Sequence, residues 1–206
     1  MAIQMVSLGD QYQCPTGPEG RLVAARMNRH HQTLTLWGLT KITIDPKFVI
    51  LDVGCGGGKT VNRLAQLAPQ GKVFGLDYSP DMVDFSKRIN KKLITQNRVE
   101  IVEANVEKTS FKNDFFDLVT AFETYYFWPN LSLALKEINR VLKQGGKLLL
   151  VNELKYGATS AKVVEETHVK LVPLEEIRTL MQSAGFVDAQ LFTDSNSDWN
   201  AIVAQK

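Results

Sequence analysis

"VILDVGCGGGKT", residues 49–60, joins a short apolar run to a glycine-rich turn and then to the start of a helix. The run 48–53 is apolar and rich in β-branched residues, which is typical of a strand that is buried on both faces. Helical spacing follows the glycines, in the apolar residues Val61, Leu64, Ala65 and Ala68. A buried strand that turns through glycines into an amphipathic helix is the opening unit of a parallel sheet.

The rest of the chain repeats this alternation of strands and helices. We expect further strands at residues 72–77, 98–104, 115–122 and 146–153, and a terminal hairpin of strands within 188–194 and 198–205. Ser79 and Pro80 predict a helix start, followed by an apolar stripe of Met82, Phe85, Ile89 and Leu93. Later helices are expected at about 131–143, with Gly145 as the C-cap, and at 173–186. The pattern predicts an α/β fold with helices around a parallel sheet.

Composition limits the classes of function. The chain has 206 residues, 44% of them hydrophobic, which suits one domain with a large core. Its 24 basic and 22 acidic residues leave a net charge of +2, so nucleic acid is not an expected partner. The first residues resemble no leader, and no apolar run approaches the roughly 20 residues that span a bilayer. We therefore expect a cytoplasmic protein without membrane insertion.

The glycine turn fits neither of the common phosphate-binding patterns. A P-loop would need its first glycine at position 53, which is Val53, and a dinucleotide fingerprint would need its third at position 59, which is Lys59. The spacing that fits is D-x-G-x-G-x-G over residues 52–58, with a second acid, Asp77, at the end of the next expected strand. The sequence thus argues against ATP and NAD.

This spacing resembles the class I S-adenosylmethionine-dependent methyltransferases. The similarity runs from about residue 47 to 204 and includes, in order, "LDVGCGGG", "GLDYSPDM", "ANV", "FDLVTAFE" and "VLKQGGKLLL". The later segments are most similar to the small-molecule branch related to quinone biosynthesis. The resemblance implies a Rossmann-like, seven-stranded and mostly parallel sheet with an antiparallel C-terminal strand and helices on both faces. It also implies S-adenosylmethionine as cofactor and S-adenosylhomocysteine as product.

The resemblance assigns a set of cofactor-binding residues: Asp52, Gly54, Cys55, Gly56, Asp77, Tyr78, Met82, Asn105, Val106 and Phe122. The cofactor is net cationic, so acids suit its site. Asp77 is placed to accept both ribose hydroxyls, with a helix N-cap as the alternative role. Tyr78 and Met82 would pack on the adenine, or simply belong to the core. Asn105 stands where family members often have Asp, and its amide oxygen can accept from the adenine amine.

The methyl acceptor is expected beyond the strand that ends near Phe122. Candidates for its pocket are His30, His31, Glu123, Tyr125, Tyr126 and Trp128. Adjacent aromatic residues cannot all face one core, so some of residues 125–128 should line a pocket, although they could instead close the core. Glu123 could act as a base, bind an acceptor amine, contact the cofactor or merely cap, and no catalytic residue is assigned.

The N-terminal part is predicted to be a helical lid, residues 1–45, on a cofactor-binding core, residues 46–206, within one methyltransferase domain. Residues 21–39 carry an apolar helical stripe of Val23, Met27, His30, Leu34 and Trp37. Each histidine could equally be an ordinary hydrogen-bonded core residue. The three histidines have no carboxylates at ligand spacing, and Cys14 and Cys55 form no metal-binding pair, so no metal site is expected.

Several functions remain open at this point. A methyltransferase acting on a small-molecule acceptor is the leading hypothesis. A protein or RNA methyltransferase could use the basic helix face formed by Lys87, Arg88, Lys91 and Lys92, although such a face is usually only solvated. An inactive cofactor-binding module is the third alternative. A homodimer stays open beside a monomer.

Overall fold

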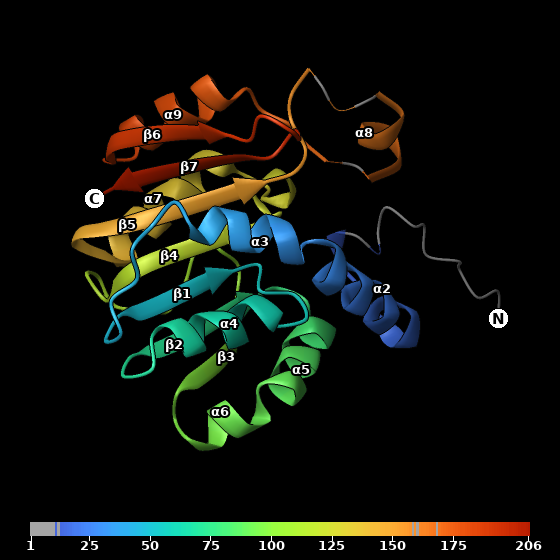
Figure 1. Cartoon of the computed structure of the whole chain (residues 1–206), viewed down its shortest axis with the longest axis vertical. Helices are drawn as coiled ribbons and strands as arrows, with labels where there is room; N and C mark the ends of the chain where they lie inside the picture. Colours follow the sequence, from blue (N-terminus) through green and yellow to red (C-terminus); the bar gives the residue numbers. More distant parts are fainter. Residues whose placement is uncertain (1–10, 12, 158, 160, 168) are drawn as a thin grey trace.

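A computed structural model describes residues 11, 13–157, 159, 161–167 and 169–206 of the chain. One seven-stranded sheet, in the order β3-β2-β1-β4-β5-β7-β6, forms the middle layer (Figure 1). Its strands are β1 (Val49–Val53), β2 (Lys72–Asp77), β3 (Val99–Glu103), β4 (Phe116–Phe122), β5 (Leu142–Asn152), β6 (Val187–Thr193) and β7 (Asn200–Gln205). The strands β3, β2, β1, β4 and β5 pair in parallel, and β7 is antiparallel to β5 and β6. The predicted fold class is confirmed.

Helices cover both faces of the sheet, because each buries one apolar stripe against the strands. One face carries α3 (Gln32–Leu39), α4 (Lys59–Leu67), α5 (Pro80–Ile89) and α6 (Lys91–Thr95), and the other carries α7 (Leu131–Val141) and α9 (Leu174–Ser183). Two further helices, α2 (Gly17–His30) and α8 (Ala161–Thr167), and the short 3₁₀ turn η1 (Tyr125–Phe127) complete the described elements. The structure therefore has two hydrophobic cores, one on each side of the sheet.

The helix starts follow their predicted chemistry. The Ser79 side chain accepts a hydrogen bond from the Met82 backbone N–H at 3.4 Å, which makes Ser79 the N-cap of α5 as expected. At α7, the Asn130 side chain accepts from the Leu133 N–H at 3.0 Å. Both caps direct a helix away from the carboxyl end of a neighbouring strand.

Two predicted helices are interrupted. Residues 21–39 form α2 and α3 instead of one helix, with a break at His31 (φ −81°, ψ 6°). The expected stripe from Met82 to Leu93 is divided between α5 and α6 at Asn90, which is 1% exposed. The Asn90 Nδ2 group donates to the carbonyls of Gly58 and Ser86, both at 3.0 Å, so a tertiary contact with the glycine turn accompanies this break.

Gly145 is not a helix C-cap. Helix α7 ends at Val141 and β5 begins at Leu142, so Gly145 (φ +77°) lies within the strand. Its backbone N–H donates to the Lys206 carbonyl at 3.0 Å, and the Lys206 N–H donates to the Gly146 carbonyl at 2.9 Å. Pairing with the end of β7 thus determines this segment, and a single sequence does not display that pairing.

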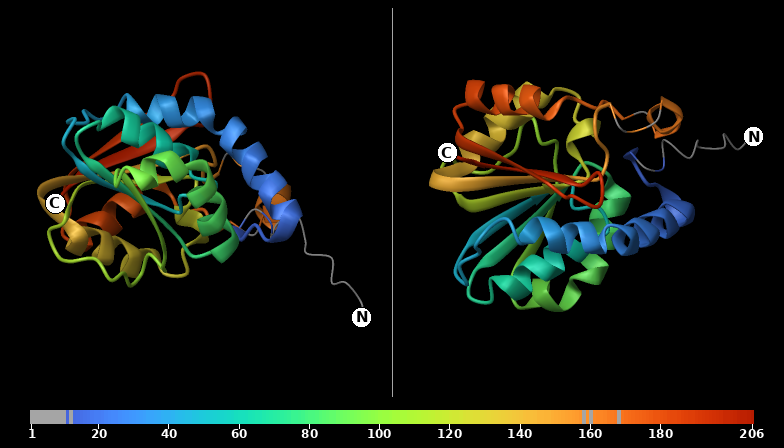
Figure 2. Two further views of the ribbon diagram at one scale, coloured as in Figure 1. Left: turned by 90° about the horizontal axis from the view of Figure 1, so that it is seen from below. Right: turned by 45° about the horizontal axis from the view of Figure 1, so that its top comes forward.

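The N-terminal helices differ in how they are packed. Helix α3 lies in the core, because Leu34 is 1% exposed and a Cβ on Gly38 would stand 2.6 Å from Val151 Cγ2. Helix α2 instead continues past the edge of the sheet toward which the β1, β4 and β5 arrows point (Figure 2). The division of the chain at residue 45 stays a prediction, and residues 1–10 of that segment lie outside the described residues. No helix in the described ranges combines the length and the apolarity needed to cross a membrane.

Candidate functional site

A pocket of about 240 Å³ opens at the carboxyl ends of β1, β2 and β4. Neighbouring strands β1 and β4 mark the point where the chain order of the sheet reverses, which is where open α/β sheets bind ligands. Helix α2 covers the pocket with Ala24, Met27 and Asn28. The ten residues predicted to bind a cofactor all line this pocket: Asp52, Gly54, Cys55, Gly56, Asp77, Tyr78, Met82, Asn105, Val106 and Phe122. Their contacts with a cofactor stay a prediction.

The glycine turn between β1 and α4 needs glycine for both conformation and space. Gly54, Gly56 and Gly58 have φ values of +67°, +47° and +74°, which other residues adopt only at a cost. A Cβ on Gly54 would lie 2.4 Å from Thr124 Cγ2, and one on Gly58 would lie 2.2 Å from Ser86 Oγ. A Cβ on Gly56 would meet no atom within 4 Å. The turn is therefore packed at its ends, and its middle leaves free space above the backbone.

Asp77 joins this turn to the end of β2. Its Oδ2 accepts from the Gly56 backbone N–H at 2.8 Å, and its Oδ1 accepts from the Ser79 N–H at 3.0 Å. Burial raises the pKa of Asp77, and the hydrogen bonds from Ser79 and Gly56 only partly oppose that shift. Each carboxylate oxygen accepts one of these bonds and keeps a further lone pair for a ligand. The N-cap of α5 is Ser79, so the capping alternative for Asp77 is not realised.

Asp52 lies one strand away and is almost completely buried. It is 2% exposed, and its Oδ1 accepts from Thr120 Oγ1 at 2.7 Å. Burial raises the pKa of Asp52 to about 7, the Thr120 hydrogen bond lowers it in part, and nearby Asp77 raises it further. Among the described residues, no lysine or arginine forms an ion pair with Asp52 that would offset its loss of water.

Two predicted adenine contacts already have partners in the protein. Tyr78 is 47% exposed and its hydroxyl donates to the Gln13 carbonyl at 2.8 Å. The Asn105 Oδ1 atom accepts from the Glu107 backbone N–H at 2.8 Å in its own turn. Both side chains still line the pocket, and the Asn105 oxygen keeps a second lone pair.

The aromatic segment after β4 is divided between pocket and core. Phe127 and Trp128 line the pocket, whereas Tyr125 and Tyr126 do not and are each 3% exposed in a core cluster. The expectation that the two tyrosines line an acceptor pocket is therefore corrected. The reason is the η1 turn, which points consecutive side chains in different directions and buries the tyrosine rings toward the α7 side of the sheet.

Glu123 directly follows β4 in an unusual backbone conformation. It has a φ of +59° and is 7% exposed, yet it faces the pocket. Its Oε2 accepts from the Tyr126 hydroxyl at 2.6 Å, and its Oε1 accepts from the Glu153 backbone N–H. Burial raises the pKa of Glu123 to about 7, although these two hydrogen bonds oppose the shift. A non-glycine residue with positive φ at a pocket wall is a common feature of functional sites.

The two predicted histidines have different surroundings. His31 lines the pocket, and burial, with a smaller effect of His30, lowers its pKa to about 4. Its imidazole is therefore neutral at physiological pH. His30 does not line the pocket; its side chain is 64% exposed and its Nε2 lies 3.0 Å from Glu153 Oε2. The third histidine, His168, lies outside the described residues.

Sequence reasoning missed several residues that line the pocket. Met27 and Asn28 come from α2, and Lys59 and Arg63 lie one turn apart at the start of α4. The basic pair had a usable signal, since positions i and i+4 share one helix face. Asn28 had none, because its contact with the glycine turn depends on how α2 crosses it: a Cβ on Gly57 would stand 2.3 Å from Asn28 Nδ2.

Comparison with known proteins agrees with this arrangement. Residues 51–150 match the family described as "Methyltransferase domain". The chain is 36% identical to demethylmenaquinone methyltransferase of Lactococcus lactis over 103 residues, which are 50% of this chain and 40% of that protein. It is 30% identical to (+)-O-methylkolavelool synthase of Herpetosiphon aurantiacus over 155 residues, 75% of this chain and 53% of that protein. The chain thus spans about half or less of the length of these relatives.

Solved structures share the whole fold. A chain in the Haloferax volcanii complex between the Trm112 methyltransferase activator and a methyltransferase superposes with a TM-score of 0.83. The match covers 98% of this chain and 99% of that chain at 19% identity, which establishes a common fold. Residues 51–150 are thus similar in sequence to the class I S-adenosylmethionine-dependent methyltransferases, and the superposition shows that the whole chain shares the fold of a methyltransferase. The cofactor of this class is S-adenosylmethionine.

Proposed function

We propose that this protein binds S-adenosylmethionine in the pocket and methylates a small molecule held beneath α2. The observation that carries the proposal is a group of three buried carboxyl groups, those of Asp52, Asp77 and Glu123, at the strand ends that line the pocket. Burial raises the pKa of each of them. A ligand that brings net positive charge would restore the interactions these groups lose with water.

The residues present fit such a cofactor. When bound, S-adenosylmethionine supplies an electrophilic methyl group on a sulfonium. Asp77 would accept the ribose hydroxyls with the lone pairs that Gly56 and Ser79 leave free. Asp52 would favour the ammonium group, and the open backbone at Gly56 would let the methionine portion approach closely. The N-terminus of α4, with Lys59 beside it, would favour the carboxylate.

The adenine would lie near the end of β2. Tyr78 and Met82 offer a ring face and a thioether, which suit contact with a flat base. Asn105 would accept from the adenine amine with its second lone pair, and Val106 and Phe122 would supply apolar contacts. Together, these roles define one orientation of the cofactor in the pocket.

The acceptor would occupy the part of the pocket between α2 and the segment after β4. Met27, Phe127 and Trp128 supply apolar walls there, and the polar lining residues of the same segments include Asn28, His31, Glu123 and Thr124. Apolar walls with few polar groups suit a small, partly aromatic or aliphatic molecule. The names of two relatives, a demethylmenaquinone methyltransferase and an O-methylkolavelool synthase, support the same class of acceptor. By enclosing the reacting groups, α2 would exclude water from them.

Labelling tests both parts of the proposal. The purified protein is incubated with methyl-labelled cofactor and with extract separated into small metabolites and macromolecules, and label is expected in the small-molecule pool. The matched control is Asp77→Asn, which should reduce labelling of every pool. Label in protein or RNA alone would show that the acceptor is a macromolecule, and would leave the proposal of methyltransferase activity intact. Calorimetry tests cofactor binding independently of the acceptor. Tight binding of magnesium-ATP without any response to S-adenosylhomocysteine would contradict the proposal entirely.

Trp128 provides a test of the acceptor end. Trp128→Ala should raise the Michaelis constant of an identified acceptor more than it changes the affinity for S-adenosylhomocysteine, because the ring lies on the wall assigned to the acceptor. Tyr126→Ala is not a suitable variant for this purpose, because Tyr126 does not line the pocket and its hydroxyl hydrogen-bonds to Glu123. Equal losses of cofactor and acceptor affinity in Trp128→Ala would argue against this division of the pocket.

A further inference from the structure

Four side chains with metal-binding atoms converge beside the junction of α2 and α3. His30 Nε2 lies 3.0 Å from Glu153 Oε2, and His31 Nε2 lies 4.0 Å from the same oxygen. Ligand atoms of His30, His31 and Glu153 all lie within 4.8 Å of one another. Glu123 Oε2 is 3.9 Å from His31 Nε2 and extends the group to a fourth member. The sequence spacing did not predict this cluster.

The fold explains why residues so far apart in sequence meet. Consecutive residues in a straight helix point about 100° apart, but the break at His31 brings the two imidazole centroids to 5.1 Å with an angle of 61° between the rings. The two acids follow the ends of neighbouring parallel strands, because Phe122 of β4 pairs with Val151 of β5. Three separate segments therefore present their ligand atoms to one point.

The separations are close to those of a zinc site. Zinc binds histidine nitrogen and carboxylate oxygen at about 2.0–2.2 Å, which in tetrahedral geometry places ligand atoms about 3.3–3.6 Å apart. The measured separations of 3.0, 3.9 and 4.0 Å lie on both sides of that range. The ligand atoms of His30, His31 and Glu153 lie within 4.8 Å of one another, so rotation of the partly exposed His30 and Glu153 side chains would have to bring them closer together around one ion.

The surroundings of the two acids favour a cation. Within the part of the chain that the structure describes, the imidazoles of His30 and His31 lie within 4.0 Å of these acids, and no lysine or arginine forms an ion pair with Glu123 or Glu153. Glu123 is also oriented by hydrogen bonds from the Tyr126 hydroxyl and the Glu153 backbone N–H. Such outer hydrogen bonds to a carboxylate ligand are typical of metal sites.

We propose that His30, His31, Glu153 and Glu123 form a binding site for a divalent transition-metal ion such as Zn²⁺. Two imidazoles with two carboxylates favour this class over Mg²⁺ and Ca²⁺, which prefer oxygen ligands. This proposal rests on the geometry of these four residues and does not depend on which molecule the protein methylates. A bound ion would connect the α2–α3 junction to the ends of β4 and β5, on a wall of the pocket that His31 and Glu123 share.

Calorimetry on the full chain, freed of metal with a chelator and desalted, tests the proposal. Titration with ZnCl₂ should show one ion per chain with a dissociation constant in the micromolar range or tighter, and MgCl₂ should give no binding under the same conditions. His30→Gln and Glu153→Gln should each weaken zinc binding at least tenfold, because loss of even an outer partner of a ligand costs about 10–100-fold. Both side chains are partly exposed, at 64% and 35%, so these variants should fold.

Two control variants distinguish this site from adventitious zinc binding. Glu100→Gln removes an exposed acid paired with Lys72, and Cys14→Ser removes the more accessible thiol; neither should change the affinity. Titration with Co²⁺ should give the visible absorption of a nitrogen and oxygen site without a thiolate charge-transfer band. The proposal is overturned if the wild-type protein binds no zinc, if His30→Gln and Glu153→Gln bind it unchanged, or if Cys14→Ser abolishes binding.

Discussion

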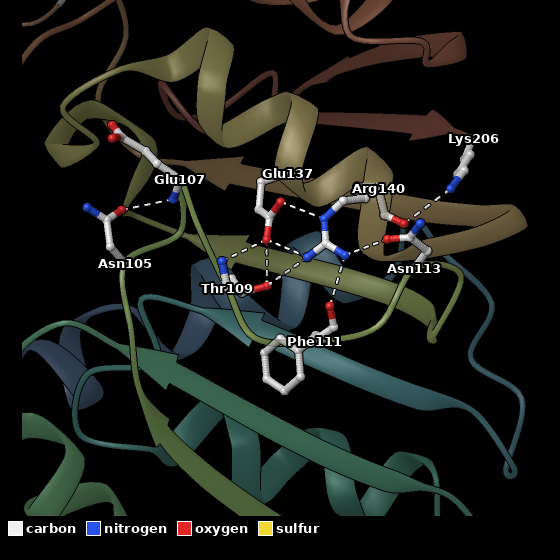
Figure 3. A network of polar contacts seen from close by, with 8 residues as sticks. All are labelled: Asn105, Glu107, Thr109, Phe111, Asn113, Glu137, Arg140 and Lys206. Carbon is white, nitrogen blue, oxygen red and sulfur yellow. Dashed lines mark hydrogen bonds and ion pairs between the residues drawn. The ribbon is translucent and has the colours of Figure 1, made fainter.

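Two acidic sites of the molecule, Glu137 on helix α7 and the pocket acids Asp52 and Glu123, have opposite surroundings. On the α7 side, Glu137 accepts from Arg140 Nε and Nη2 at 2.7 and 2.6 Å and from the Thr109 N–H and hydroxyl, both at 2.7 Å (Figure 3). At the pocket, Asp52 has a hydrogen bond from Thr120, and Glu123 has hydrogen bonds from Tyr126 and the Glu153 N–H. No lysine or arginine of the described chain forms an ion pair with either pocket acid.

The pKa values record the difference. Burial raises the pKa of Glu137, but hydrogen bonds from Arg140 and Thr109 outweigh it and lower the pKa to about 2. Burial raises the pKa of both Asp52 and Glu123 to about 7. The charge of Glu137 is fully compensated by hydrogen bonds within the folded chain, so this site stabilises the fold. The pocket acids are costly without a cationic ligand, which is the expected condition of a binding site.

The largest effect is expected on the pocket side of this comparison. Asp77→Ala should weaken binding of S-adenosylhomocysteine by about 1.5–3 kcal/mol, the scale of hydrogen bonds to a charged group, which corresponds to roughly 10–100-fold. Calorimetry measures the loss. Asp84→Ala, on the exposed face of α5, is the matched control and should bind normally. Unchanged affinity in a folded Asp77→Ala protein would remove Asp77 from the ribose.

The next largest effect is expected at Glu137. Glu137→Gln should lower the free energy of unfolding by about 1–3 kcal/mol at neutral pH, because it weakens charged hydrogen bonds at a side chain that is 12% exposed. The folded pKa of Glu137 is about 2 and the unfolded one about 4.3, so this stability is present above about pH 4.3 and disappears as the pH falls toward 2. Urea unfolding at several pH values should therefore show the two proteins converging in acid.

Glu175→Gln is the control for that measurement. Glu175 and Arg178 have the same i,i+3 spacing and a separation of 2.6 Å, but their side chains are 64% and 44% exposed. An exposed pair contributes about 0–1 kcal/mol, so Glu175→Gln should change stability little. A loss as large as that of Glu137→Gln would mean that spacing, and not the buried network, determines the effect.

A smaller effect of opposite sign is expected at Asp52. Its folded pKa is raised to about 7 against an unfolded value of about 3.9, so the wild-type protein loses stability as the pH rises between these values. Asp52→Asn escapes this loss and keeps an acceptor for Thr120. Without cofactor, the variant should be more stable than wild type by about 1 kcal/mol or more near pH 8, since one unit of pKa shift corresponds to about 1.4 kcal/mol.

Asp52→Asn also changes how far a ligand stabilises the protein. Asp52→Asn should gain less stability than wild type from S-adenosylhomocysteine, because it lacks the charge that would interact with the ammonium group. Thermal unfolding with and without ligand gives both numbers. Equal stabilisation by ligand would show that Asp52 is only an isolated buried acid.

The smallest effect is expected at Asn105. Asn105→Asp should keep or slightly improve S-adenosylhomocysteine binding, because a carboxylate oxygen can accept both from the Glu107 N–H and from the adenine amine. Calorimetry decides this as well. A large loss of affinity would mean that the amide of Asn105 acts through its N–H₂ group.

The sequence predicted best those features that are determined by residues adjacent in the chain. The acids Asp52 and Asp77 could be placed because each lies at the carboxyl end of a strand, and parallel strands end at the same edge of a sheet. The seven-stranded arrangement was implied by the family resemblance that the motifs carry. Strand ends and glycine turns are local features, so one sequence suffices for them.

Contacts between distant segments were beyond its reach. Nothing in the run of aromatics from Tyr125 to Trp128 indicates which rings face inward, since that depends on a single 3₁₀ turn and on the core behind it. His30 and Glu153 are separated by 123 positions. Their proximity requires both the break at His31 and the position of the end of β5, and neither has a local sequence signal.

The break at His31 also bears on kinetics. Helix α3 is fixed in the core, while the other end of α2 is tied to the β2–α5 turn through Gly17 N–H to Asp81 Oδ2 at 2.9 Å and Ser79 Oγ–H to the Pro15 carbonyl at 3.2 Å. Helix α2 thus crosses the pocket between the break at His31 and a start that is held by these hydrogen bonds and by packing against α5. Because these hydrogen bonds lie outside the two hydrophobic clusters of the sheet, we expect changes to them to alter the rates at which ligands enter and leave the pocket more than the stability of the fold.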